Sequence, residues 1–179
     1  VPPGQCSELI DDGGFEGGAW QILSTAYEAR YTTAPVRNGE QALQAGMLDE
    51  PPVVSYSSAQ QTVTLPQTDQ GITLRFWYWP LAELPTAGLQ YVVLLDSEGQ
   101  AIDYLMWQRS NAQAWTLAEH DLSAYAGQKL TLRFGAHNSQ ANVDEGLSTA
   151  LVVDDVSLQV CGASSAAPGE PRMHLPRII

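Results

Sequence analysis

Apolar residues in this chain recur at every second position, in short runs separated by turn residues. In residues 71–80, GITLRFWYWP, one face carries Ile72, Leu74, Phe76 and Tyr78, and the other carries Thr73, Arg75, Trp77 and Trp79. Similar runs cover residues 60–66, 89–109, 128–138 and 149–160, and a Ser-Glu-Gly turn makes the second of these a hairpin. A period of two indicates β-strands. We therefore predict an all-β fold, a jelly-roll β-sandwich of two antiparallel sheets.

The composition suits one domain followed by a short tail. The 179 residues are 44% hydrophobic, which is enough for one core. Residues 162–171 are rich in small residues, and residues 172–179, RMHLPRII, are basic and apolar. We predict a sandwich module over residues 1–161 and a linker and tail over residues 162–179. We expect the tail to lie extended against a sheet edge or apolar groove of its own domain or of a neighbouring copy. The alternative is a packing contact without a role in solution.

The chain is strongly acidic. Asp and Glu number 20 against 8 Lys and Arg, which gives a formal net charge of −12. Such a surface repels nucleic-acid phosphates and anionic lipids, so we expect neither as a partner. The sequence has no run of 18 apolar residues, so we also expect no membrane insertion. A soluble acidic surface without a specific partner would explain the charge as well.

Two cysteines lie near the ends of the module, Cys6 before the first expected strand and Cys161 at the end of the last. Two cysteines without a CxxC pair are too few for a cysteine metal site. If the terminal strands are neighbours, Cys6 and Cys161 can form a disulfide. A disulfide would indicate a secreted or cell-surface, extracytoplasmic protein. The alternative is two unrelated buried thiols.

Two adjacent aspartates interrupt the last apolar strand, LVVDDVSLQV at residues 151–160. If this strand alternates regularly, Asp154 shares a face with Val152, Val156 and Leu158 and points toward the core, whereas Asp155 faces solvent. A buried carboxylate without a partner is strongly destabilising. Asp154 therefore needs a cation or several hydrogen-bond donors.

Four segments resemble carbohydrate-binding modules of the family 4, 9 and 22 type, which are galactose-binding-like jelly rolls. The segments are DDGGFEGGAW at 11–20, VRNGEQAL at 36–43, AWTLAEHDLSAYAGQKLTLRF at 114–134 and LVVDDVSL at 151–158. The resemblance covers residues 8–161 and implies the jelly-roll fold. Its motifs specify the fold more than sugar binding, because the same fold occurs appended to secreted peptidases and in adhesion modules.

The resemblance also implies a structural calcium between the first and last strands. Carried over, Glu16 and Asp154 match the family's acidic ligands, and Glu40 lies near the place of a further ligand. Main-chain carbonyls would complete the shell, since Ca²⁺ binds about 6–8 oxygens. The alternative is that Asp154 accepts N–H bonds from the opening loop without a metal. The oxygen-rich segment 137–146 lacks EF-hand spacing, and we expect a solvated turn there.

Aromatic side chains on the outer faces of the expected strands suggest a sugar-binding surface, because sugar rings stack on flat aromatic faces. We predict that one concave sheet carries six ligand-binding residues: Arg75, Trp77, Trp79, Trp107, Arg133 and His137. For Trp77 and Trp79, packing at the core or at a sheet edge is the alternative.

The sequence contains no GxSxG, HExxH or phosphate-loop motif, so we expect no enzymatic activity. The predicted function is that of a non-catalytic accessory module in a larger secreted protein, which binds a polysaccharide or glycan. The alternative is a protein-interaction or stabilising domain appended to a secreted peptidase or adhesin.

Overall fold

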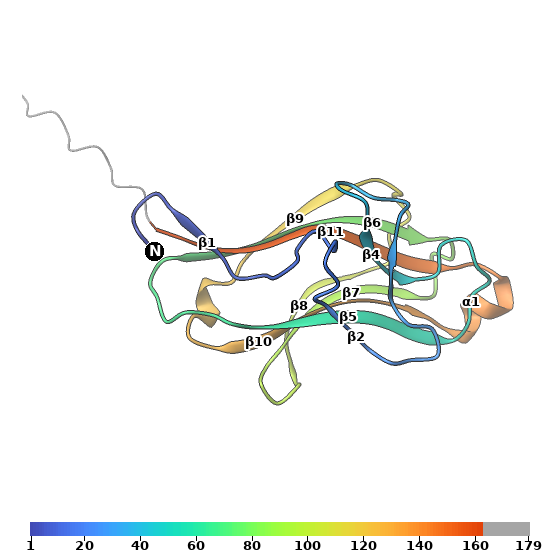
Figure 1. Ribbon diagram of the computed structural model, residues 1–179. Helices are drawn as coiled ribbons and strands as arrows, with labels where there is room; N and C mark the ends of the chain where they lie inside the picture. Colours follow the sequence, from blue (N-terminus) through green and yellow to red (C-terminus); the bar gives the residue numbers. More distant parts are fainter. Residues whose placement is uncertain (163–179) are drawn as a thin grey trace, which may run out of the picture.

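The protein is described by a computed structural model over residues 1–162. Two antiparallel sheets lie face to face (Figure 1), so the predicted β-sandwich is confirmed. The six-stranded sheet contains, in order, β3 (Arg30–Thr32), β4 (Ala42–Gly46), β11 (Thr149–Cys161), β6 (Gly71–Ala82) and β9 (Thr116–Asp121), and β1 (Cys6–Glu8) also pairs with β11. The five-stranded sheet contains β2 (Gln21–Ile22), β5 (Ser55–Thr64), β10 (Lys129–Asn138), β7 (Leu89–Leu95) and β8 (Ala101–Gln108).

The core lies between the inner faces of β6 and β10, as their alternating patterns predict. The rings of Phe76 and Phe134 meet edge to face with their centroids 5.1 Å apart, a favoured arrangement for buried aromatic rings. Four aliphatic side chains of these two strands are almost fully buried around them: Ile72, Leu74, Leu130 and Leu132. The outer faces of both sheets are therefore free to carry polar and aromatic residues.

The first and last strands are neighbours, and the predicted disulfide is confirmed. Cys6 lies opposite Cys161 in the antiparallel pair β1–β11, and the two residues are bonded. Pro3 and Gly162 form a bridge just outside these strands. The predicted docking of residues 172–179 lies outside the described residues. Within residues 1–162, none of the helices has the length and hydrophobicity to cross a membrane.

Two short helical segments connect strands at the ends of the sandwich. The turn η1 (Ser123–Tyr125) precedes β10. The helix α1 (Gln140–Glu145) follows β10, so the prediction of a solvated turn at residues 137–146 is wrong. Asn142 is fully buried, and its amide donates hydrogen bonds to the Leu147 carbonyl and the Thr149 hydroxyl. The Asn142 side chain therefore stabilises the fold, because it satisfies buried polar groups around it.

Strand β11 contains a bulge that reverses its alternation. Its register against β6 shifts between Asp154 and Ser157, and Asp155 has a positive φ of 50°. Leu151 and Val153 belong to the core before the bulge, and Val156 and Leu158 belong to it afterwards. Since Asp154 pairs with Trp77, both lie on the outer face of the six-stranded sheet. The prediction that Asp154 points toward the core is therefore wrong, because an extra residue shifts the period of two.

Candidate functional site

The six predicted ligand-binding residues lie on two different sheets. Arg75, Trp77 and Trp79 belong to β6 in the six-stranded sheet. Trp107 belongs to β8, and Arg133 and His137 belong to β10, both in the five-stranded sheet. The outer faces of the two sheets point to opposite sides of the sandwich. The prediction that all six residues line one sheet is therefore wrong.

On the six-stranded sheet, the candidate side chains contact other parts of the protein. The guanidinium of Arg37 lies 3.8 Å from the ring centroid of Trp77 and pairs with Asp155. Arg75 pairs with Glu119 at 2.6 Å. Trp77 is therefore covered by an arginine, which supports the packing alternative for this residue.

Trp79 borders a hollow of about 500 Å³ on the same side of the molecule. The hollow contains one aromatic ring and two carboxylates, those of Asp49 and Glu83. A single partly buried ring gives little area for stacking a sugar.

The outer face of the five-stranded sheet carries an aromatic groove. We use this name for the hollow of about 210 Å³ over β5, β10, β7 and β8, in which Tyr56, Tyr104 and Trp107 are 56%, 58% and 63% exposed. The rings of Tyr104 and Trp107 meet edge to face with centroids 5.2 Å apart. Tyr56 stacks on His137 with centroids 4.2 Å apart. Large exposed rings that contact each other on one face are unusual unless they serve binding.

A bulge in β8 brings Tyr104 and Trp107 to the same face. Val92 pairs with Met106 but Val93 pairs with Tyr104, so Leu105 is an extra residue against β7. Two residues an odd number of positions apart would otherwise point to opposite faces. The bulge therefore builds one wall of the aromatic groove.

Gly135 provides space for the ring that forms the floor of the aromatic groove. It lies on β10 opposite Tyr91, and a Cβ at position 135 would collide with the Tyr91 ring. Tyr91 is only 8% exposed, in contrast to the rings around it. A glycine inside a strand commonly marks such a close approach.

Beyond the aromatic groove, the same face becomes polar. A second hollow of about 340 Å³ is lined by side chains of β5 and β10 and by the β7–β8 turn, which projects from the lower sheet in yellow-green (Figure 1). Arg133 and Leu95 line both hollows, so the two are continuous. The Arg133 Nε donates a hydrogen bond to the Gln60 side-chain oxygen at 2.9 Å. We call this second hollow the polar groove.

Tyr91 in the aromatic groove and His137, which stacks on Tyr56 beside it, are both uncharged at neutral pH. Burial raises the pKa of the Tyr91 phenol, and burial lowers the pKa of the His137 imidazole. Both side chains are therefore neutral at pH 7. Arg133 is the cation at the junction of the two grooves.

Sequence reasoning missed Tyr56, Tyr91 and Tyr104, three of the four aromatic side chains lining the aromatic groove. Gly135 could have indicated the place of Tyr91, because a glycine inside a strand often marks a point where another group approaches the backbone closely. Tyr104 could not be assigned to the face of Trp107 without knowledge of the bulge.

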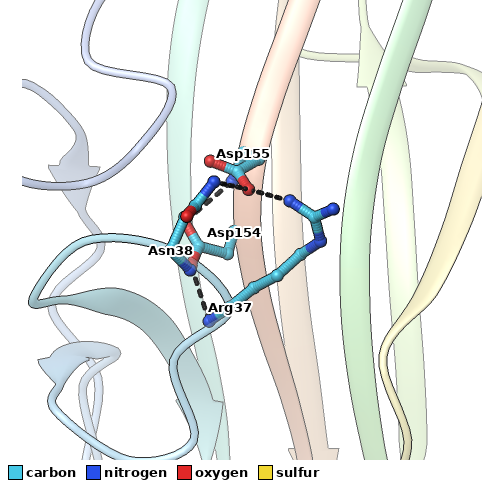
Figure 2. Close-up of polar contacts among 4 residues, drawn as sticks. All are labelled: Arg37, Asn38, Asp154 and Asp155. Carbon is cyan, nitrogen blue, oxygen red and sulfur yellow. Dashed lines mark hydrogen bonds and ion pairs between the residues drawn. The ribbon is translucent and has the colours of Figure 1, made fainter.

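The buried carboxylate of Asp154 binds a turn that covers the outside of β11. Its Oδ2 accepts hydrogen bonds from the backbone N–H groups of Arg37 and Asn38, at 3.0 and 3.1 Å, and its Oδ1 accepts one from Asp155 (Figure 2). Burial raises the pKa of Asp154, although these three N–H groups act in the opposite direction. The three N–H donors to Asp154 thus come from the turn at 37–38 and from β11 itself, not from the opening loop.

The proposed metal ligands fit a calcium site only in part. Glu16 accepts hydrogen bonds from the backbone N–H groups of Glu40 and Gln41, so Glu16 and Asp154 bind the same turn, residues 37–41. Glu40 is exposed, and its contact with Glu16 is made by its backbone. Within residues 1–162, no three His, Cys, Asp or Glu side chains are grouped as metal ligands. Main-chain carbonyls would have to supply most of a calcium shell.

No family model matches the chain, and no curated protein matches it. Three solved structures show what it resembles. TmCBM61 in complex with beta-1,4-galactotriose has a TM-score of 0.58 at 16% identity, covering 85% of this chain and 97% of that one. The K3 cleaved adhesin domain of Lys-gingipain from Porphyromonas gingivalis W83 has a TM-score of 0.57 at 14% identity, covering 85% and 98%. The CBM22-1 xylan-binding domain of Xyn10C from Paenibacillus barcinonensis has a TM-score of 0.50 at 16% identity, covering 92% and 99%.

At these identities the likeness concerns the fold. It agrees with the resemblance in the sequence motifs, and it extends over nearly the whole length of each of the three structures. The chain has the β-sandwich fold of carbohydrate-binding modules and of gingipain adhesin domains.

Proposed function

We propose that this protein is a non-catalytic extracellular module that binds carbohydrate in the aromatic groove. The observation that carries the proposal is the pair Tyr104 and Trp107, two exposed rings beside a polar groove on one sheet face. Aromatic rings offer flat apolar surfaces at a small cost in conformational entropy. The amide, hydroxyl and guanidinium groups of the polar groove can form hydrogen bonds with sugar hydroxyls. Ligand sites commonly combine an apolar surface with a few such polar groups.

An extracellular location is part of the proposal. The Cys6–Cys161 disulfide supports it, since disulfides persist in oxidising compartments. Two of the structures that share the fold are described as bound to galactotriose and as xylan-binding. A polysaccharide of this general kind is the ligand that we propose.

The protein-interaction alternative also has a specific observation in its favour. The gingipain adhesin domain is as similar in structure as the galactotriose-bound module, with TM-scores of 0.57 and 0.58. The aromatic groove favours carbohydrate binding over protein interaction, because a sugar ring needs exposed aromatic faces within one hollow. Tyr56, Tyr104 and Trp107 provide them.

Substitution of the exposed rings tests the proposal. We expect Trp107→Ala and Tyr104→Ala each to weaken oligosaccharide binding at least about tenfold, since one lost stacking contact of about 1.4 kcal/mol has that effect. Isothermal titration calorimetry against a panel of neutral and acidic oligosaccharides measures the change. Trp79→Ala on the opposite sheet is the control, and thermal melts verify that all variants are folded. Binding lost in Trp79→Ala but kept in Trp107→Ala would place the site on the other face. No binding to any glycan would leave the protein-interaction alternative.

The proposal includes a structural calcium at the turn 37–41. Its support is that Glu16 and Asp154 reach the same turn from two distant segments. Calcium would neutralise these carboxylates and join the opening segment to β11. Nothing in the proposed binding mechanism depends on the ion.

A further inference from the structure

The Lys and Arg side chains of this acidic protein differ in whether they form ion pairs. Of the six Lys and Arg in residues 1–162, three form ion pairs with carboxylates, namely Arg30, Arg37 and Arg75. Arg109 donates to the Gly88 carbonyl at 2.7 Å. Within the described chain, Lys129 and Arg133 have no ion-pair partner, and both line the polar groove.

Lys129 and Arg133 point to the same side of β10. They are four residues apart, with Thr131 between them, so all three lie on the outer face. Strand geometry places the Cα atoms of Lys129 and Arg133 about 13 Å apart. This spacing is longer than one sugar ring, so an oligosaccharide that lies along β10 can contact both cations.

One carboxylate also lines the polar groove. The Asp96 Oδ1 accepts hydrogen bonds from the backbone N–H groups of Glu98 and Gln100, both at 2.9 Å, and so stabilises the β7–β8 turn. The two cations exceed this one carboxylate in a protein with a formal net charge of −12. The side chains that line the polar groove therefore carry more positive than negative charge, in contrast to the protein as a whole.

We infer that the ligand of this face is an acidic oligosaccharide, with anionic groups that contact Lys129 and Arg133 while one ring stacks on Trp107. This inference rests on the proposed carbohydrate-binding function. A guanidinium binds a carboxylate or a sulfate ester through charge-assisted hydrogen bonds. Both uronates and sulfated sugars supply this chemistry.

Binding of neutral sugars and of their anionic derivatives tests the inference independently of the proposed function. Neutral galacto- and gluco-oligosaccharides are compared with the same chains oxidised to the C6 carboxylate and with their sulfated forms. Calorimetry is done at about 0.15 M ionic strength, where a Debye length of about 8 Å screens the distant acidic groups. We expect an anionic form to bind at least roughly tenfold more tightly than its neutral parent, as one charge-assisted hydrogen bond would produce.

Two variants test the role of the cations. Lys129→Gln and Arg133→Gln should each reduce this preference severalfold, whereas Arg75→Gln on the opposite sheet should leave it unchanged. Tighter binding of the oxidised form supports a uronate, and tighter binding of the sulfated form supports a sulfated sugar. Equal binding of neutral and anionic forms would overturn the inference and leave the proposed function in place. Absence of binding to every form would overturn both.

Discussion

A single buried carboxylate, that of Asp154, fixes the turn at 37–38 on the outside of the six-stranded sheet. Asp154→Asn keeps the size of the side chain but replaces one accepting oxygen with an NH₂ group. At least one backbone N–H then loses its acceptor in a buried place. We expect the free energy of unfolding to fall by about 1–3 kcal/mol, the usual cost of an unpaired buried donor. Urea denaturation measures this change.

Asp155→Asn is the matched control for that substitution. Asp155 is partly exposed, and its ion pair with Arg37 is worth about 0–1 kcal/mol. Its positive φ is a conformation that Asn tolerates. An equal fall in the free energy of unfolding of the two variants would show that the hydrogen bonds of Asp154 stabilise the fold no more than the exposed ion pair does.

At the scale of elements, the alternation of apolar residues predicts where strands lie but not where they bulge. It gives the inner faces of β6 and β10 correctly. It fails at Asp154 in β11 and at Tyr104 in β8, and each failure follows an extra residue that shifts the period. Bulges depend on the partner strand, so a single strand's sequence contains little signal for them. The aromatic groove could not be predicted for this reason.

The turn 37–41 is the element on which a calcium ion would act, because Glu16 and Asp154 bind its two ends. An ion that binds only the folded protein stabilises it by RT ln(1 + [L]/Kd), about 2.7 kcal/mol at 100 Kd. We expect excess chelator to lower the melting temperature of the wild-type protein. Glu16→Gln should respond less, since it lacks one of the two carboxylates. Identical wild-type melts with calcium and with chelator would exclude the ion.

At the scale of the whole molecule, the sequence predicts the class of the fold more fully than the arrangement of its faces. The spacing of the strands and the positions of Cys6 and Cys161 indicated a sandwich with neighbouring terminal strands. Alternation does not tell which strands share a sheet, because pairing joins residues far apart in sequence. Alternation therefore places the outer faces of β6 and β10 on one surface, although the two strands belong to opposite sheets. The separation of the two tryptophans of β6 from Trp107 follows from this pairing.

The Cys6–Cys161 disulfide closes nearly the whole described chain, with a sequence separation of 155. In the chain-entropy model a loop of this size stabilises the folded state by about 5 kcal/mol, and loss of a native disulfide commonly costs about 2–5 kcal/mol. β1 has three exposed residues, so it buries little to hold itself on β11. We expect Cys6→Ala/Cys161→Ala to lower the free energy of unfolding by about 2–5 kcal/mol in guanidinium denaturation, with fraying of β1 visible as faster amide exchange. A reductant should shift the wild-type transition toward that of the double variant and leave the variant unchanged. If the wild-type midpoint did not move on complete reduction, the pairing of β1 with β11 would be stable without the covalent bond.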